Sequence, residues 1–275
     1  MVTVAVAGGS REEILALVTR AHEKYPGTLT FLVFDTADNI DQQGVWEYIP
    51  CKDEKEMVKK AVSSVANDQA QILLKGIVQT HTILKEVLQK EHGLKTQNVL
   101  SHAALIDLPN IDRPILLADA GMNIAPSKEE LIDIIHNTAG VAAKIGLMKP
   151  KIALLSAAEN VNPKMPSSVL AKEVTEHFSE SKEVTVFGPI SLDLALSKEA
   201  VAHKRFTGPI EGDADILIVP NIDVGNVLYK SLVLFGKAVT GGTIVGTKVP
   251  IVLTSRSDAL ESKLYSLEFA MKQVQ

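Results

Sequence analysis

Strand-like and helix-like segments alternate along almost the whole chain of 275 residues. Aliphatic and β-branched runs predict strands at residues 3–7, 30–34, 72–74, 99–106, 114–118, 152–155, 184–187, 216–219 and 251–254. Amphipathic segments predict a helix that begins at Asp53 and others at residues 10–21, 80–90, 127–146, 167–178, 197–204, 225–234 and 257–272. Ser10 with Glu13, and Ser127 with Glu130, have the spacing of capping boxes. This rhythm favours α/β layering around mainly parallel sheets.

Composition and charge argue against some kinds of binding partner. A net charge of −5 without a basic run argues against a nucleic-acid partner, and 4% aromatic residues leave little for base stacking. The first residues lack the basic start of a signal peptide, and no apolar run reaches the roughly 18 residues of a transmembrane helix. Cys51 is the single cysteine, which fits a reducing compartment. We therefore expect a cytoplasmic protein that binds neither nucleic acid nor membrane.

The alternation is interrupted near residues 104–110, where two predicted strands follow each other across a polar turn. The interruption predicts a boundary between two α/β domains with a cleft between them. Ligands of such folds bind in clefts between domains and beyond the carboxyl ends of parallel strands.

One candidate site lies between the last predicted strand and the last helix, at Ser255 and Arg256. A strand-to-helix turn offers unpaired N–H groups and the positive end of a helix dipole. The hydroxyl and the guanidinium add donors suited to a phosphate or an oxyanion. The alternative is a capping serine beside a solvated arginine.

Other polar turns follow predicted strands in the same way. Lys75 precedes Gly76, which permits close approach of the backbone; the alternative is a bend glycine beside a solvated lysine. Lys164 projects from a loop fixed by two prolines, before Ser167; the alternative is a plain helix-entry loop. Because such turns converge on one side of a parallel sheet, they predict a shared anion-binding cleft. The remaining candidates lie at helix starts or on helices: Thr80, Asn221, Asn226 and Lys230.

Several other chemistries have little support. Seven scattered histidines and one cysteine do not suit zinc, so we expect no metal. The chain has neither a Gly-x-x-x-x-Gly-Lys-Ser/Thr phosphate loop nor a Gly-x-Ser-x-Gly nucleophile elbow. Gly8-Gly9 with Asp35 is faintly similar to a dinucleotide-binding turn, which leaves a nucleotide-dependent oxidoreductase as an alternative.

At these same segments the chain resembles the phosphate acetyl/butyryltransferase family, and its butyryl branch closely. The first seventy residues carry little of the signature. The matching motifs run in order from about residue 72 to the C-terminus: Leu73-Leu-Lys-Gly76, Ser101-His-Ala-Ala104, Ala118-Asp-Ala-Gly-Met-Asn-Ile-Ala-Pro126, Asn162-Pro-Lys-Met-Pro-Ser167, Gly188-Pro189, Pro220-Asn221, Gly225-Asn226, Tyr229-Lys230 and Leu253-Thr-Ser-Arg256.

The resemblance implies a reversible transfer in which butyryl-CoA and phosphate give butyryl phosphate and CoA, both as substrates, with no bound cofactor. It implies the two-domain α/β fold of the isocitrate and isopropylmalate dehydrogenases, here residues 1–104 with 243–275 and residues 105–242. It also implies a homodimer or a larger homo-oligomer. Ser255 would stabilise the developing oxyanion and Arg256 would clamp phosphate. Phosphate and CoA would contact Lys75, Gly76, Thr80, Lys164, Ser167, Asn221, Asn226 and Lys230.

Ser262 departs from the acetyl branch, which has a catalytic aspartate seven residues after the serine. Glu261 is adjacent, but neighbouring helix positions point about 100° apart. Three possibilities stay open for the general base: Glu261, a residue elsewhere in the cleft, or no dedicated base. The alternatives to a phosphate butyryltransferase are a phosphate acetyltransferase and a CoA- or acyl-phosphate-binding homologue that has lost its base.

Overall fold

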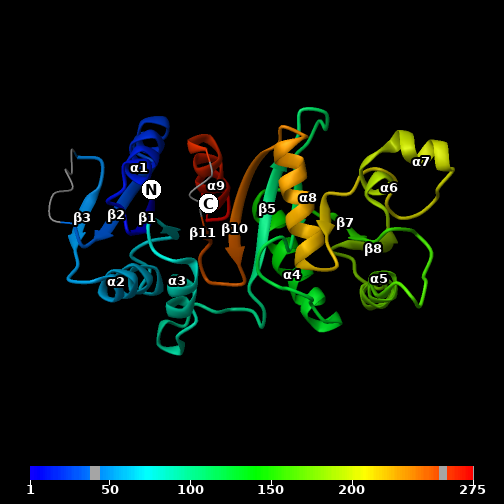
Figure 1. Cartoon of the computed structure of the whole chain (residues 1–275), viewed down its shortest axis with the longest axis horizontal. Helices are drawn as coiled ribbons and strands as arrows, with labels where there is room; N and C mark the ends of the chain where they lie inside the picture. Colours follow the sequence, from blue (N-terminus) through cyan, green and yellow to red (C-terminus); the bar gives the residue numbers. More distant parts are fainter. Residues whose placement is uncertain (38–43, 254–258, 275) are drawn as a thin grey trace. The chain divides into compact units, whose positions relative to one another are not determined.

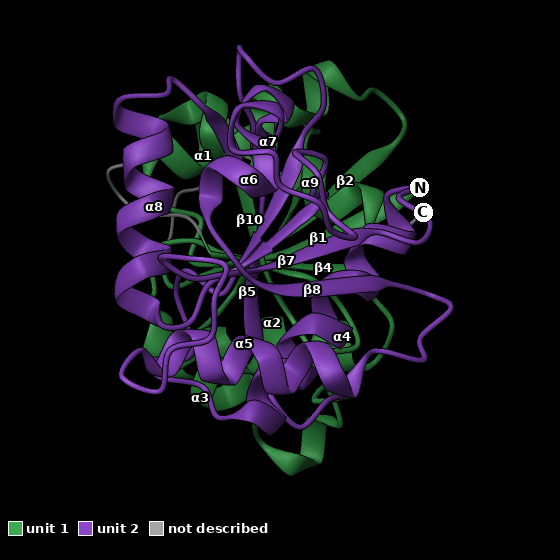
Figure 2. Ribbon diagram, turned by 90° about the vertical axis from the view of Figure 1, so that its right-hand side faces the viewer, with its two compact units in different colours: residues 1–96, 241–275 green, residues 97–240 purple. Residues whose placement is uncertain are grey.

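The chain forms two compact units in the computed structural model, which describes residues 1–37, 44–253 and 259–274 (Figure 2). The first unit comprises Met1–Thr96 with Gly241–Gln275, and the second comprises Gln97–Thr240. The sequence instead places the boundaries after residues 104 and 242. The first of these differs because residues 101–104 begin a strand that pairs within the second unit, with Ala104 opposite Leu117.

The strands of the first unit lie in the spatial order β3, β2, β1, β4, β11 and β10. Neighbouring strands run parallel from β3 to β11, whereas β10 is antiparallel to β11. Strand β10 begins in the last two residues of the second unit. The bounds are β1 Val2–Ala7, β2 Leu29–Asp35, β3 Glu47–Pro50, β4 Ile72–Lys75, β10 Val239–Val245 and β11 Ile251–Leu253.

Helices cover both faces of this sheet. Helices α1 (Glu12–Lys24) and α9 (Leu260–Lys272) pack against each other on one face, and α2 (Glu54–Ala66) and α3 (Thr80–Val87) lie on the other (Figure 1). A single 3-10 turn, η1, spans Lys90–His92. The buried core between the sheet and the α1–α9 layer is aliphatic, as the low aromatic content requires, apart from Phe31.

The second unit has strands in the order β5, β6, β9, β7 and β8, all parallel except β5. Its elements are β5 Ser101–Asp107, β6 Ile115–Ala118, α4 Lys128–Lys144, β7 Lys151–Leu155, α5 Pro166–His177, β8 Thr185–Ile190, α6 Leu192–Leu196, α7 Lys198–Lys204, β9 Ile216–Ile218 and α8 Ile222–Leu234. Helices α4 and α5 lie together on one side of this sheet, and α6 and α7 lie on the other (Figure 2).

The predicted α/β architecture with mainly parallel sheets is confirmed. The capping box at Ser127 is also confirmed: its hydroxyl accepts from Glu130 N, while the Glu130 carboxylate accepts from Ser127 N. The sequence does not predict strand β10, because Gly241-Gly242 at its centre interrupts the run of aliphatic and β-branched residues. A β-carbon at Gly241 would lie 2.7 Å from the Tyr265 carbonyl oxygen of α9, so the strand needs a glycine there.

No helix among the described residues combines the length and the apolar character needed to span a lipid bilayer.

Candidate active site

The carboxyl ends of three parallel strands meet in register at one edge of the first unit. Ala7 at the end of β1 pairs with Lys75 at the end of β4, and Lys75 pairs with Leu253 at the end of β11. Ser255 and Arg256 follow Leu253 by two and three residues, and both lie outside the described residues. The roles predicted for these two residues stay predictions.

Two glycine backbones touch at this edge. Gly76 N donates to the Ala7 carbonyl at 2.9 Å, and Ile77 N donates to the Gly8 carbonyl at 2.9 Å. A β-carbon at position 76 would lie 1.8 Å from the Gly8 oxygen. The sequence predicts that another segment of backbone lies close to Gly76. In the structure that segment is the loop that follows β1 and contains Gly8.

The Lys75 ammonium is held inside the protein at the same edge. Lys75 is only 8% exposed, and its Nζ donates to the carbonyl oxygens of Gly76 and Val78, both at 3.3 Å. The alternative of a solvated lysine is thus wrong. A cation fixed by carbonyl groups at the end of a strand can attract an anion without losing side-chain entropy on binding.

The other candidates of the first unit lie at helix starts. Thr80 is the first residue of α3 and is exposed, and Glu261, in the first turn of α9, is exposed as well. Positions near helix N-termini favour negative ligands such as phosphate. The roles predicted for Thr80 and Glu261 stay predictions.

Asp35, the last residue of β2, binds backbone amides of the loop after β1 and of the residues that follow β2. Its carboxylate accepts hydrogen bonds from Ser10 N at 2.7 Å, Thr36 N at 2.7 Å and Ala37 N at 3.0 Å. The capping box expected at Ser10 is wrong, because Arg11 precedes α1 and the Ser10 amide turns to Asp35. Since Asp35 is 1% exposed and saturated by backbone amides, it is poorly placed to bind a ribose hydroxyl. This arrangement speaks against the oxidoreductase alternative.

A cavity of about 690 Å³ lies at the carboxyl ends of β7 and β9, against α8 in the second unit. Two predicted site residues, Ser167 and Asn221, line it. The Ser167 hydroxyl is 3.0 Å from that of Ser156, and Asn221 Oδ1 caps α8 by accepting from Val224 N at 3.0 Å. None of the described residues that line this cavity is basic.

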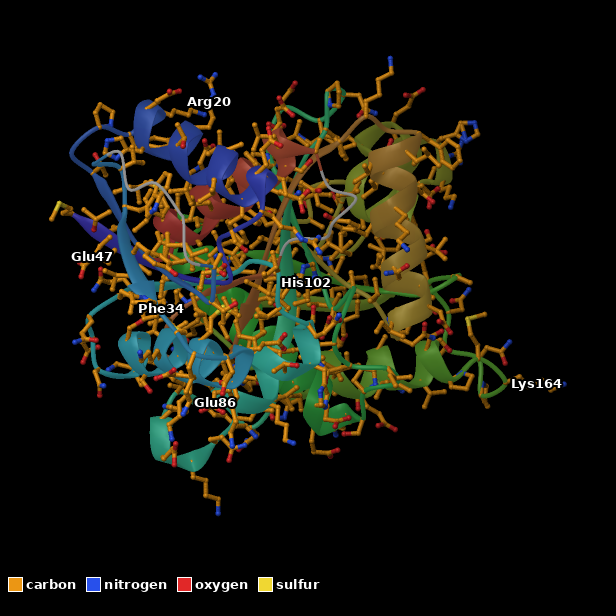
Figure 3. The ribbon with its side chains drawn as sticks, turned by 60° about the vertical axis from the view of Figure 1, so that its left-hand side comes forward. Arg20, Phe34, Glu47, Glu86, His102 and Lys164 are labelled. Atoms are coloured by element: carbon orange, nitrogen blue, oxygen red, sulfur yellow. The ribbon has the colours of Figure 1, made fainter. Side chains whose placement is uncertain are left out.

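The remaining predicted contacts lie elsewhere on the second unit. Lys164 is exposed, and its side chain extends away from the ribbon (Figure 3). Asn226 and Lys230 lie one turn apart on α8, and neither lines the cavity. The structure therefore groups Ser167 with Asn221, and it does not bring Lys164, Asn226 or Lys230 into the cavity.

The loop after β6 contains a buried carboxylate to which the sequence analysis gave no role. Asp119 is 2% exposed, and its oxygens accept from Gly121 N, Met122 N, Asn123 N and Asn123 Nδ2 at 2.6–3.2 Å. The motif Ala118–Pro126 contains these residues, but nothing in their spacing reveals that the loop folds back on its own aspartate.

His102 lies against this loop. Its ring is close enough to Gly121 that a β-carbon there would lie 3.6 Å from His102 Cγ, and the Tyr229 ring stands edge-on at 6.2 Å. His102 Nδ1 is buried and has no hydrogen-bond partner among the described residues. Burial lowers the pKa of His102 below its ordinary value of 6.5, against the opposing charge of Asp119. The imidazole is therefore neutral at pH 7.

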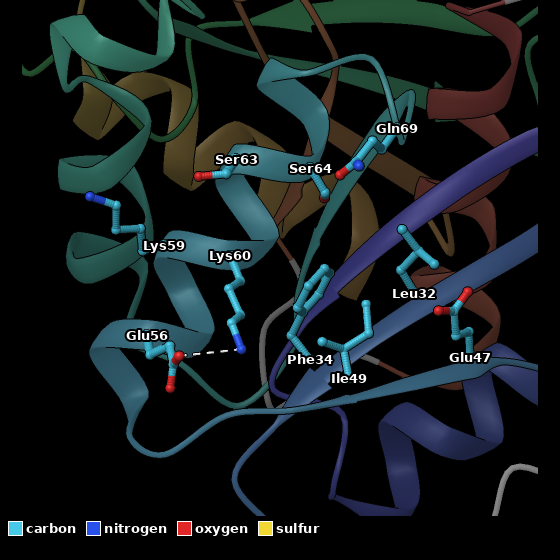
Figure 4. A pocket seen from close by; sticks show the side chains of 10 residues that line it. All are labelled: Leu32, Phe34, Glu47, Ile49, Glu56, Lys59, Lys60, Ser63, Ser64 and Gln69. Carbon is cyan, nitrogen blue, oxygen red and sulfur yellow. Dashed lines mark ion pairs between the residues drawn. The ribbon is translucent and has the colours of Figure 1, made fainter.

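A second cavity, of about 560 Å³, lies between α2 and the strands β2 and β3 (Figure 4). It contains none of the predicted site residues. Its two lysines are occupied by carboxylates: Lys60 Nζ lies 3.2 Å from Glu56, and Lys59 Nζ lies 3.0 Å from Glu91. Charges already paired in this way make the cavity a poor anion site.

Comparison with known proteins identifies the family. The model of the family described as Phosphate acetyl/butaryl transferase matches residues 35–270. The chain belongs to this family. It is 40% identical to the phosphate butyryltransferase of Clostridium beijerinckii over 97% of this chain and 91% of that protein. The chain is therefore a phosphate acyltransferase, which exchanges acyl groups between CoA and phosphate.

Solved structures agree with this assignment. The crystal structure of a branched-chain phosphotransacylase from Enterococcus faecalis V583 superposes with a TM-score of 0.97 at 63% identity, over 100% of this chain and 99% of that one. A 4-hydroxythreonine-4-phosphate dehydrogenase from Klebsiella pneumoniae superposes with a TM-score of 0.61 at 11% identity, over 100% and 99% of the chains. The second likeness shows that the two-unit α/β fold is shared with dehydrogenases of different chemistry.

Proposed function

We propose that this phosphate acyltransferase prefers butyryl groups, so that butyryl-CoA and phosphate give butyryl phosphate and CoA. The observation that carries the proposed site is the register of the strand ends, where Lys75 stands beside the strand that leads to Ser255 and Arg256. This register supports a cluster of donors and two cations at one edge of the first unit. Such a cluster suits a substrate that is doubly charged and has a developing oxyanion.

In the direction of acyl-phosphate breakdown, the CoA thiol loses its proton to a base and the thiolate attacks the acyl carbonyl carbon. A free thiol has a pKa near ~8.5, so a base and a positive field both favour the attack. The C–S bond forms as the carbonyl oxygen becomes an oxyanion, to which the Ser255 hydroxyl donates. The oxyanion then collapses to a carbonyl as the C–O bond to phosphate breaks. The departing phosphate takes up the proton that the base removed from the thiol, and it leaves as the dianion HPO4²⁻ held by Arg256 and Lys75.

Glu261 is the base that we propose for the thiol proton. It lies in the first turn of the helix that follows Ser255 and Arg256, and it is exposed. Replacement of Glu261 by Gln should lower the rate most at low pH, where free thiolate is scarce. A rate that is unchanged across pH would leave the reaction without a base at this position.

A branched acyl group is the second candidate substrate. It is favoured by the high identity of the chain to the Enterococcus faecalis protein, whose structure is described as that of a branched-chain phosphotransacylase. One additional methyl group changes binding by only ~1–3 kcal/mol, so linear and branched substrates must be compared directly.

The test is the release of CoA thiol from acetyl-, propionyl-, butyryl-, valeryl-, isobutyryl- and isovaleryl-CoA, with and without phosphate. We expect release that requires phosphate and is fastest with butyryl-CoA. A maximum with a branched substrate would favour the second candidate, and one with acetyl-CoA would indicate a phosphate acetyltransferase. Release without phosphate would indicate a thioesterase, and no release from a folded protein that binds CoA would indicate a homologue without its base.

The site assignment is tested by Arg256→Ala, with Arg20→Ala as the matched control on the exposed surface of α1. Loss of one donor that contacts the transferring group typically costs about 10²–10³ in rate, and we expect that loss for Arg256→Ala and for Ser255→Ala. Full activity in Arg256→Ala would show that phosphate is held elsewhere.

A further inference from the structure

A further cavity, of about 450 Å³, lies at the amino ends of β7 and β8 in the second unit. Lys149 and Pro150, which line it, directly precede β7, and Val184 directly precedes β8. Ligands of the reaction are expected at the carboxyl ends of parallel strands, where Ser167 and Asn221 line the cavity described above. A molecule bound at the amino ends is therefore separate from the ligands expected there.

Most of the residues that line this cavity are apolar or small. Phe178 and Leu147 supply apolar surface, and α4 contributes Ala139, Gly140 and Ala143. Gly140 lies in the interior of α4, where glycine is less favourable than alanine, and an added β-carbon would meet nothing within 4 Å. The short side chains along α4 thus leave room for the apolar part of a ligand.

Two lysines and a histidine supply donors to the same lining. Lys149 and Lys182 form no ion pair with another described residue, in contrast to the two lysines of the cavity beside α2. His136 adds a ring that can donate a hydrogen bond. Glu183 is the one acidic residue among the described residues of the lining. The lining therefore has an excess of positive charge, although the whole chain has a net charge of −5.

The carboxyl ends of α4 and α5 also lie at this cavity, and helix ends of this kind have a partial negative charge. Their carbonyl groups are already paired within the chain. Leu147 N donates to the Ala142 carbonyl at 2.8 Å, and Phe178 N donates to the Val174 carbonyl at 3.3 Å. Because these bonds satisfy the helix ends, the lysines are the main charges that the cavity offers to a ligand.

We propose that this cavity binds a small amphipathic anion. Its apolar part would pack against Leu147 and Phe178, and its carboxylate or phosphate group would pair with Lys149 and Lys182. The volume of about 450 Å³ is in the range of small-molecule sites, roughly 300–1,000 Å³. A ligand with one charged and one apolar end uses both parts of the lining, whereas inorganic phosphate would use the lysines alone. This inference rests neither on the acyl preference nor on the catalytic residues proposed above.

The first test is the binding of octanoate and octyl phosphate to the full chain, measured by isothermal titration calorimetry. We expect an anion to bind, and we expect dissociation constants about 10-fold higher or more for octylammonium, which reverses the charge, and for octanol, which removes it. Tighter binding of octyl phosphate would identify the ligand as a phosphate ester, and tighter binding of octanoate would identify it as a carboxylate. A smaller difference between the anions and octylammonium, or no binding of either anion, would overturn the proposal.

The second test locates the bound anion. Lys182→Glu should raise the dissociation constant of the tighter anion by about 10-fold or more. Lys172→Glu is the matched control, since Lys172 is an exposed lysine of α5 that does not line the cavity, and it should leave the constant unchanged. Gly140→Leu should abolish binding by filling the cavity, and circular dichroism confirms that each variant is folded. Binding that is lost in Arg256→Ala but unchanged in Lys182→Glu would assign the anion to the catalytic site and overturn the proposal.

Discussion

The α-carbon of Gly76 and the carbonyl oxygen of Gly8 are so close that a β-carbon at position 76 would lie 1.8 Å from that oxygen. Gly8 belongs to the loop after β1, and Gly76 follows β4. Because Gly8 itself has a positive φ of 85°, neither side of the contact can accept a larger residue without moving the backbone. The contact fixes the position of Lys75, whose ammonium donates to the Gly76 carbonyl.

Gly76→Ala should therefore destabilise the protein by about 3 kcal/mol or more, because the clash is with backbone that cannot rotate away. The urea midpoint of unfolding measures this change. Gly140→Ala is the matched control: it lies in α4, its β-carbon would meet nothing within 4 Å, and it should stabilise by about 0.5–1 kcal/mol. A Gly76→Ala protein with an unchanged midpoint would contradict the close contact.

Lys75→Met should keep the fold and weaken phosphate binding. Methionine is apolar and of similar length, but it removes the donor of the Gly76 and Val78 carbonyl oxygens, so we expect the fold to be kept with a loss of about 1–3 kcal/mol. Loss of a charged hydrogen bond of about 1.5–3 kcal/mol predicts a KM for phosphate raised roughly 10- to 100-fold. Lys59→Met, on the exposed surface of α2, should leave that KM unchanged. Equal KM values for the two variants would remove Lys75 from the phosphate site.

Asp119→Asn should destabilise the second unit, because the carboxylate accepts four hydrogen bonds and an amide cannot replace both oxygens. We expect a loss of about 2–4 kcal/mol, measured as the shift of the unfolding midpoint. Asp53→Asn provides the comparison, since Asp53 only caps α2 and asparagine caps equally well. Similar midpoints for the two variants would argue against the network around Asp119.

His102 should make stability depend on pH. Its pKa in the folded protein is below the ordinary 6.5, so the unfolded chain binds a proton more readily. The stability due to neutral His102 is thus fully present above about pH 6.5 and falls below it, by up to about 1.4 kcal/mol per pH unit. Thermal unfolding between pH 7.5 and 5 should show this slope, and His102→Gln should reduce it. Exposed His136→Gln should retain the slope of the unmodified protein.

Periodicity in the sequence predicts the alternating layers well, because buried parallel strands such as β4 are short uninterrupted aliphatic runs. It fails for β3, a partly exposed strand with the sequence Glu47-Tyr-Ile-Pro50, and for the glycine-rich β10. Both segments are strands because they pair with a neighbouring strand, and not because their own residues favour the extended conformation.

The candidate site is predicted only in part for a similar reason. Lys75 and Gly76 stand out locally, because a charge and a glycine end an apolar strand. Asp35 stands out only as part of a turn similar to a dinucleotide-binding one, and Asp119 does not stand out, since both carboxylates bind backbone amides that only the folded loops bring to them. The cavity at Ser167 and Asn221 likewise depends on which faces of α5 and α8 meet, which spacing alone does not determine.

The first unit is built from the two ends of the chain, joined where Lys24 meets Glu268 at 2.7 Å and Glu13 meets Lys263 at 3.4 Å. A chain emerging from the ribosome therefore exposes β4 as an open sheet edge until β11, which follows the whole second unit in the sequence, is synthesised. The second unit, continuous in sequence, has all its residues well before that moment. Synthesis that stops early would release a chain whose first unit is unpaired along β4 and prone to join the edges of other unfinished copies.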